Sequence, residues 1–270
     1  MSATERMTKL SISLGQLQIK LARVEDNLES AERMISESAA RDSQLILLPE
    51  LWSTGYDLEN ATDYADELGA GMFAQLSNIA RDQSIALFGS ILERRGDQFM
   101  NCAAYYDADG SLAGVYRKIH LFRLFDEHKW LGEGEAPTMV DLPWGPAGLS
   151  ICYDLRFPEL FRGYAVEQGA KLILICAEWP LVRVEHWRAL LIARAIENQC
   201  FVAATNSCGD TGGTVFAGHS MIVDPWGAVI AEAGEDECLV TAEIDLDEVD
   251  RVRRAIPVFE DRRPDAYLTR

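Results

Sequence analysis

The stretch that decides the fold is AGLSICYDLRFPEL, residues 147–160. Its first six residues, Ala147–Cys152, are mostly apolar or small, which predicts a short buried strand. Pro158 can occupy the first turn of a helix, where the missing N–H group of proline costs nothing, and Gly169 can close that helix. The stretch therefore predicts a strand, a tight turn and a helix in immediate succession.

The same alternation of strands and helices extends in both directions along the chain. Helical apolar spacing predicts helices at Val24–Ala40, Asp63–Asp82, Pro158–Gln168 and Val184–Asn198. Shorter apolar or alternating runs predict strands at Leu10–Ile19, Leu45–Leu48, Ile85–Ser90, Gln98–Asp107, Leu112–Tyr116, Ala147–Cys152, Leu172–Cys176, Phe201–Ala204, Ser220–Val223 and Leu239–Ile244. Hairpin-like strand pairs mixed with strand–helix units favour an α+β fold or a layered α/β sandwich. The pattern leaves the strand order open.

Composition narrows the class of protein. The 270 residues carry 25 Lys+Arg against 43 Asp+Glu, a formal charge of −18, and 48% are hydrophobic. These values predict a soluble protein with one domain over residues 1–270, because single cores grow to roughly 250–300 residues. An acidic chain is a poor ligand for nucleic acid, and no apolar run approaches the roughly 18 residues of a membrane span.

The amino-terminal segment and the metal-binding residue types add further expectations. Residues 1–6 are polar and lack signal-peptide architecture, so we expect a cytoplasmic protein whose native start is Met1 or Met7. The six cysteines form no CxxC pair and the four histidines have no paired spacing. We therefore expect reduced, mostly buried cysteines and no metal site.

Three polar residues lie just beyond apolar runs: Glu50, Lys118 and Cys152. If their strands run the same way in one sheet, the three side chains converge at one rim, where open α/β sheets bind ligands. The alternative is that charged residues simply flank strands. Lys118 is notable because the chain contains five lysines and 20 arginines, and the pKa of lysine responds to burial.

These residue types form a workable set for acyl transfer. A thiol with a pKa of about 8.5 is mostly protonated at neutral pH, so a carboxylate must take its proton and later give it to a leaving amine. An ammonium group stabilises first the thiolate and then the oxyanion. Free N–H groups in the turn after Cys152 can complete an oxyanion hole.

Three segments, LLPELW (47–52), YRKIHLF (116–122) and SICYDLRFPE (150–159), occur in an order that resembles the nitrilase superfamily of carbon–nitrogen hydrolases. The resemblance extends over nearly the whole chain, including ARAIENQ (193–199) and DRRPDAY (261–267). It implies a four-layer α-β-β-α sandwich without a metal or organic cofactor. It also implies a homodimer or higher even oligomer, in which Val184–Asn198 lies at the interface and the tail, residues 246–270, packs on the partner subunit.

The resemblance assigns roles to individual residues. Glu50 would be the general base, Lys118 the oxyanion stabiliser and Cys152 the nucleophile. Glu127 would be a second glutamate that orients the lysine and the substrate, the alternative being an exposed loop carboxylate. The N–H group of Tyr153 would share the oxyanion hole.

Two further features are similar to the branch that contains ω-amidases, which hydrolyse the terminal amide of α-keto acids such as 2-oxoglutaramate. They are KIHLFR (118–123) followed by DEH (126–128), and WP (179–180) followed by HW (186–187). The departure is Glu178, where many relatives have Asn; its negative charge is expected to weaken the binding of acidic substrates.

Arg156 and Trp179 are further substrate-binding candidates. Arg156 would anchor a substrate carboxylate or hold its own loop, and Trp179 would line the pocket or belong to the core. His120 is expected to pack or orient near Lys118, and the glycine-rich run Gly209–Gly213 is expected to be a flexible loop.

The sequence is compatible with three functions. The favoured one is a thiol amidohydrolase that releases ammonia from a small amide, most simply an ω-amide of an α-keto acid. The alternatives are an N-carbamoyl amide hydrolase and a catalytically silent binding or scaffold module with the same fold.

Overall fold

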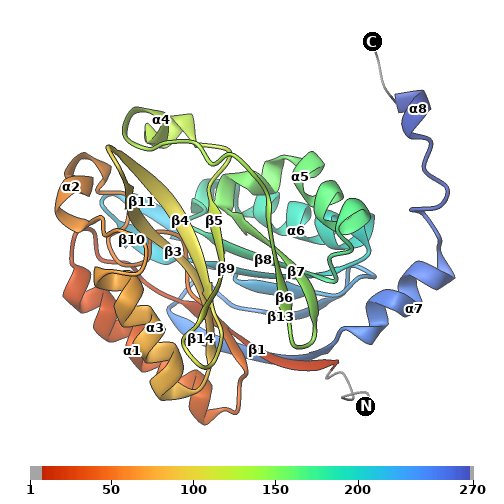
Figure 1. Ribbon diagram of the computed structural model, residues 1–270, viewed down its shortest axis with the longest axis horizontal. Coiled ribbons are helices and arrows are strands. Elements are labelled where there is room, and N and C mark those ends of the chain that lie inside the picture. Colours follow the sequence, from red (N-terminus) through yellow and green to blue (C-terminus); the bar gives the residue numbers. More distant parts are fainter. Residues whose placement is uncertain (1–7, 268–270) are drawn as a thin grey trace.

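The computed structural model describes residues 8–267, which form two six-stranded sheets packed face to face (Figure 1). The order in the first sheet is β14-β1-β2-β3-β4-β5, and in the second β13-β12-β9-β8-β7-β6. The strands of the first sheet are β1 (Lys9–Gln16), β2 (Leu45–Leu47), β3 (Ala86–Arg95), β4 (Gln98–Tyr106), β5 (Leu112–Arg117) and β14 (Cys238–Asp245). Those of the second are β6 (Thr138–Leu142), β7 (Gly145–Ile151), β8 (Leu172–Ala177), β9 (Phe201–Asn206), β12 (Met221–Val223) and β13 (Val229–Glu232).

Helices cover the outer face of each sheet. Helices α1 (Val24–Ala40) and α3 (Gly71–Gln83) lie on the first sheet, and α5 (Pro158–Arg162) and α6 (Val184–Asn198) lie on the second (Figure 1). The expected α-β-β-α sandwich is therefore confirmed, and the bounds of α1 and α6 match the predicted ones.

Strand periodicity explains how one strand serves two layers. In β2, Leu45 and Leu47 point into the core between the sheets, whereas Ile46 points into the core beneath α1 and α3. Side chains alternate between the two faces of a strand, so a continuously apolar run such as Leu45–Leu48 is what a strand buried on both sides requires.

Strand direction brings functional residues to one end of the sandwich. Strands β1, β2 and β3 are parallel to one another. Strand β4 is antiparallel to β3, and β5 is antiparallel to β4, so β2 and β5 point the same way. In the second sheet β7, β8 and β9 are parallel. Residues that follow β2 and β5, or β7 and β8, therefore lie at a common end of their sheet.

Two glycine-containing segments differ from the prediction. The expected helix Asp63–Asp82 is divided into α2 (Ala61–Tyr64) and α3, because Gly71 has a positive φ and the Asp66 carboxylate accepts the Met72 N–H group at 2.7 Å. The expected loop Gly209–Gly213 is wrong. It belongs to a hairpin of β10 (Cys208–Thr211) and β11 (Thr214–Ala217), whose two-residue turn, residues 212–213, has positive φ at both glycines.

The helix predicted to begin at Pro158 begins there, but α5 ends at Arg162 and a π-helical turn continues it to Glu167. The charged tail contains α7 (Asp247–Ala255), which buries Val249 and Val252 against the body of the molecule. Helix α8 (Pro264–Tyr267) lies away from the sandwich (Figure 1). Met1 and Met7, the two candidate starts, lie outside the described residues.

No helix within residues 8–267 combines the length and the hydrophobicity that crossing a membrane requires.

Candidate active site

Four polar residues meet between the two sheets. Glu50 and Lys118 follow β2 and β5 of the first sheet, and Cys152 and Glu178 follow β7 and β8 of the second. The expectation of one shared rim of a single sheet is therefore wrong. Alternating polarity along a strand shows which side chains are buried, but it does not show which sheet the strand joins.

The backbone of Cys152 is held in an uncommon conformation. Its φ is +44°, and it begins a tight 3₁₀ turn, Cys152–Arg156, directly after β7. A non-glycine residue with positive φ costs free energy and persists only where its surroundings enforce it.

Asp154 supplies that enforcement. Its Oδ2 accepts hydrogen bonds from the Ile151 N–H group at 2.9 Å and from the Tyr116 hydroxyl at 2.7 Å. Its Oδ1 lies 2.7 Å from Nδ1 of His120, whose ring stacks on Phe157 with centroids 3.7 Å apart. His120 therefore packs against the turn that carries the cysteine, and its ring is oriented by Asp154 rather than by the lysine.

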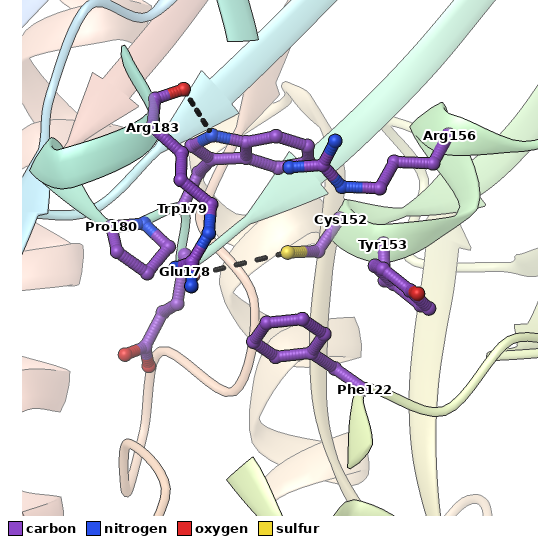
Figure 2. Close-up of a pocket in the computed structure, with 8 residues that line it drawn as sticks. All are labelled: Phe122, Cys152, Tyr153, Arg156, Glu178, Trp179, Pro180 and Arg183. Atoms are coloured by element: carbon purple, nitrogen blue, oxygen red, sulfur yellow. Dashed lines mark hydrogen bonds between the residues drawn. The ribbon is translucent and has the colours of Figure 1, made fainter. Parts of the chain in front are cut away.

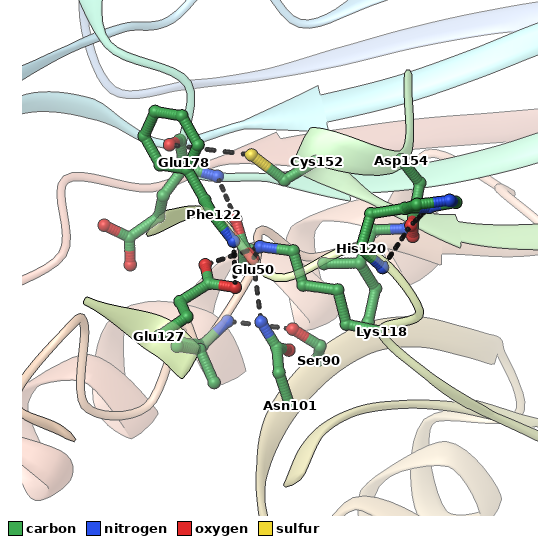
Figure 3. Close-up of polar contacts among 12 residues, drawn as sticks. Glu50, Ser90, Asn101, Lys118, His120, Phe122, Glu127, Cys152, Asp154 and Glu178 are labelled. Atoms are coloured by element: carbon green, nitrogen blue, oxygen red, sulfur yellow. Dashed lines mark hydrogen bonds and ion pairs between the residues drawn. The ribbon is translucent and has the colours of Figure 1, made fainter. Parts of the chain in front are cut away.

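A buried ion cluster lies beneath Cys152 (Figure 3). The Lys118 ammonium lies 2.7 Å from Oε1 of Glu50 and 2.6 Å from Oε1 of Glu127, and all three side chains are fully buried. Glu127 begins the short helix α4 (Glu127–Trp130) and also accepts the Tyr56 hydroxyl at 2.7 Å and the Phe122 N–H group at 2.9 Å. The alternative of an exposed loop carboxylate at Glu127 is excluded.

Further donors fix the Glu50 carboxylate. Its Oε1 accepts the Asn101 side-chain amide at 2.7 Å, and its Oε2 accepts the Glu178 N–H group at 2.9 Å. Asn101 was not among the residues predicted from the sequence. The available signal was an amide residue inside the otherwise apolar run of β4, because a buried amide needs a partner.

Electrostatics in the cluster set the resting protonation states. Burial by itself lowers the pKa of Lys118, but Glu127 and Glu50 together raise it well above its ordinary value, so the lysine stays charged. Burial raises the pKa of the Cys152 thiol, the negative charge of Glu50 raises it further, and Lys118 opposes both effects. The resting sulfur is therefore a thiol, and a base must remove its proton for it to act as a nucleophile.

The pocket at Cys152 is shown in Figure 2. The Arg156 guanidinium lies 4.6 Å from the centroid of the Trp179 ring, within the range of a cation–π contact, and Trp179 is also buried, with its indole N–H group donating to the Arg183 carbonyl at 2.8 Å. Trp179 is thus both core residue and pocket wall. The lining residues are Phe122, Cys152, Tyr153, Arg156, Glu178, Trp179, Pro180 and Arg183. Phe122 and Arg183 were not predicted as site residues from the sequence.

Glu178 has no such contacts for its side chain. Its carboxyl group is buried and points away from the thiol in Figure 2. Neither oxygen has a hydrogen-bond partner within residues 8–267. Burial raises the pKa of Glu178 well above its ordinary value, Glu50 and Glu127 add to the increase, and Lys118 opposes it.

Solved structures show which class this architecture defines. A CN-hydrolase superfamily protein from Xanthomonas campestris, crystallised with an arsenic adduct in its active site, is 32% identical to the chain and superposes with a TM-score of 0.90. The match covers 95% of this chain and 98% of that one. Nit3 of Saccharomyces cerevisiae, a member of the nitrilase superfamily, is also 32% identical and superposes with a TM-score of 0.87 over 95% of this chain and 98% of that one, so the fold is that of the nitrilase superfamily.

The chain belongs to the carbon–nitrogen hydrolase family, whose model matches residues 11–254. It is 44% identical over 260 residues to the 2-oxoglutaramate amidase of Bacillus subtilis, which covers 96% of this chain and 100% of the relative. It is 36% identical over 271 residues to the omega-amidase NIT2 of Homo sapiens, covering 97% and 98% of the two chains.

Proposed function

We propose that the protein is an ω-amidase that hydrolyses the terminal amide of an α-keto acid such as 2-oxoglutaramate and releases ammonia. The observation that carries this proposal is the buried cluster of Glu50, Lys118 and Glu127 beside the thiol of Cys152. The names of the two relatives supply the substrate class.

The first half of the reaction forms a thioester. The Cys152 sulfur attacks the amide carbon while Glu50 accepts the thiol proton. The carbonyl oxygen becomes an oxyanion, which the Lys118 ammonium and the N–H group of Tyr153 stabilise. Glu50 then gives its proton to the amide nitrogen, the C–N bond breaks, and ammonia leaves.

The second half hydrolyses the thioester. Glu50 takes a proton from water, the resulting hydroxide attacks the thioester carbon, and the C–S bond breaks. The sulfur recovers the proton from Glu50, so one amide and one water give one carboxylic acid and one ammonia. This double use of Glu50 is supported by its fixed geometry, because three donors hold its two oxygens.

The remaining site residues position these groups. Glu127 orients Lys118, since one of its oxygens accepts both the ammonium and the Tyr56 hydroxyl. Arg156 is the anchor for the substrate carboxylate and Trp179 the wall on which its guanidinium rests, a role supported by their stacking at the pocket.

We further propose that residues 1–270 form one hydrolase domain that acts in the cytoplasm as a homodimer or higher even homo-oligomer. The six free cysteines suit a reducing compartment. The interface would include α6 and the tail, residues 246–270, where Ile196 and Ile256 are each about half exposed. Small amides and water would be its partners, without nucleic acid or membrane.

The test is ammonia release from five compounds: 2-oxoglutaramate, 2-oxosuccinamate, glutamine, an N-carbamoyl amino acid and a simple nitrile. The Cys152→Ala variant is the blank. We expect the two keto-acid amides to be turned over far faster than the others. Preference for the carbamoyl compound, with carbon dioxide release, would instead establish an N-carbamoyl amide hydrolase.

A thiol titration at neutral pH completes this test. Cys238 is partly exposed and reacts in either case, so Cys152 is compared with the four other buried cysteines. A Cys152 that reacts far faster than those four, with that reactivity lost in Cys152→Ala, supports an enzyme, because Glu50 lies beside it to take the thiol proton. Five equally slow buried cysteines, together with no turnover of any compound, would leave only a scaffold module.

A further inference from the structure

The main chain of Glu178 is locked to the reacting groups. Its N–H group donates to Glu50 at 2.9 Å, and its carbonyl oxygen lies 3.8 Å from the Cys152 sulfur. The next residue, Trp179, donates its N–H group to the Asn206 side chain at 2.6 Å. Residue 178 therefore cannot move without disturbing the general base and the nucleophile.

The Glu178 carboxyl group has no ion-pair partner among residues 8–267, although Arg156 and Arg183 line the same pocket. Only 1% of the residue is exposed, and its two oxygens lack partners in the described chain, residues 8–267. The charged groups that act on it are Glu50, Glu127 and Lys118, and the single ammonium is already shared by the other two carboxylates. A third buried negative charge without a cation is too costly, so the group is held as a neutral acid.

A neutral carboxylic acid brings a proton to donate. Glu178 borders both the Cys152 pocket and a hollow of about 220 Å³ that is also lined by Tyr56 and Thr211. The Tyr56 hydroxyl already donates to Glu127, and the Thr211 hydroxyl to the Ile19 carbonyl. The Glu178 proton has no acceptor among the residues that the structure describes.

Resting on the ω-amidase function proposed above, we propose that Glu178 is a specificity-determining residue that donates a hydrogen bond to the α-oxo oxygen of the substrate's acyl chain. Glutamine carries an α-ammonium group at that carbon, which has no lone pair to accept this proton. The residue thus favours amides of α-keto acids over amides of amino acids. An ionised Glu178 would have the opposite preference, because a carboxylate would attract the ammonium group of an amino acid and repel an acidic substrate.

The experiment compares kcat and KM of Glu178→Ala and Glu178→Gln on every amide that the wild-type enzyme turns over. The alanine variant removes the donor, and we expect it to lower kcat/KM for 2-oxoglutaramate about tenfold, mainly by raising KM. The glutamine variant keeps a neutral N–H donor of similar shape, so its loss should be several times smaller. Glu185→Gln, an exposed change at the start of α6, is the matched control and should leave both constants unchanged.

Two outcomes would overturn the proposal. An increase of tenfold or more in kcat/KM of Glu178→Gln for 2-oxoglutaramate would mean that the native residue is an anion that repels the substrate. An equal fall in kcat for all amides, with no change in their ranking, would mean a structural role. If wild-type enzyme ignores 2-oxoglutaramate but cleaves another acid amide, the ω-amidase proposal fails while the same variants still test Glu178 on that amide.

Discussion

Two buried polar networks flank Cys152, and they differ in what they contact. The Glu50–Lys118–Glu127 network holds two carboxylates around one ammonium and lies beside the sulfur. The Asp154 network holds one carboxylate among a tyrosine hydroxyl, a histidine ring and backbone N–H groups, and it fixes the backbone of the turn. The first can move protons and stabilise developing charge, whereas the second can only set positions. The difference separates chemistry from placement within one site.

The largest expected effect comes from removing the Cys152 sulfur, which both networks surround. Cys152→Ala should lower kcat by about 10⁴-fold or more, because nothing else can form the thioester, while the free energy of unfolding changes by only about 1 kcal/mol. Steady-state ammonia release and urea unfolding measure both quantities. Cys200→Ala, another buried free cysteine, is the control and should stay active; turnover by Cys152→Ala would refute the mechanism.

The next effect tests the charged network. Lys118→Met leaves two buried carboxylates unpaired, so we expect kcat to fall by about 10²–10³-fold and the free energy of unfolding to fall by about 3 kcal/mol. Lys129→Met breaks an ion pair with Asp126 whose side chains are more than half exposed, and it should cost less than about 1 kcal/mol. Equal stability losses in the two variants would contradict the burial argument.

Breaking the positioning network should have a milder and different signature. The Asp154 carboxylate accepts hydrogen bonds from four donors, whereas the amide of Asp154→Asn places its own NH2 group against at least one of them. We expect kcat to fall about 10- to 100-fold. The pH dependence of kcat should keep the wild-type shape, since the proton carrier Glu50 is untouched. A shifted pH profile would place Asp154 in proton transfer instead.

The smallest expected effect on activity comes from Glu178, whose carboxyl group belongs to neither network. Burial raises the pKa of Glu178 in the folded state above its value in the unfolded chain. Its contribution to stability is therefore fully present below the unfolded value of about 4.3 and is lost as pH rises toward the folded value. In urea unfolding from pH 4 to pH 8, Glu178→Gln should gain stability relative to wild type. A constant difference would show that the group is ionised in the folded protein.

The sequence predicted most of the charged network. Glu50, Lys118 and Cys152 follow apolar runs, Glu127 was identified from the family resemblance, and the structure brings the four together. Asn101 was missed because an amide in an apolar strand indicates that a partner exists, but nothing local indicates that the partner lies 51 residues away.

Long-range packing also explains the other differences. Helices α1 and α6 could be bounded from their own periodicity, which is a local property. The meeting of residues from two separate sheets, and the neutral state that the surroundings impose on Glu178, depend on contacts between distant segments. Local patterns contain no information about such contacts.

Because the site is divided between two sheets, the turnover rate depends on the distance between them. Glu50 and Lys118 are carried by one sheet and Cys152 by the other, so the apolar side chains between the sheets set the gap that the proton must cross. Interiors are packed too tightly to absorb a missing methylene unnoticed, and a misplacement of about 1 Å can cost about 100-fold in rate. Shortening the side chain of Leu47 or Leu149, both inside that core, should therefore lower the turnover rate of protein that is still folded.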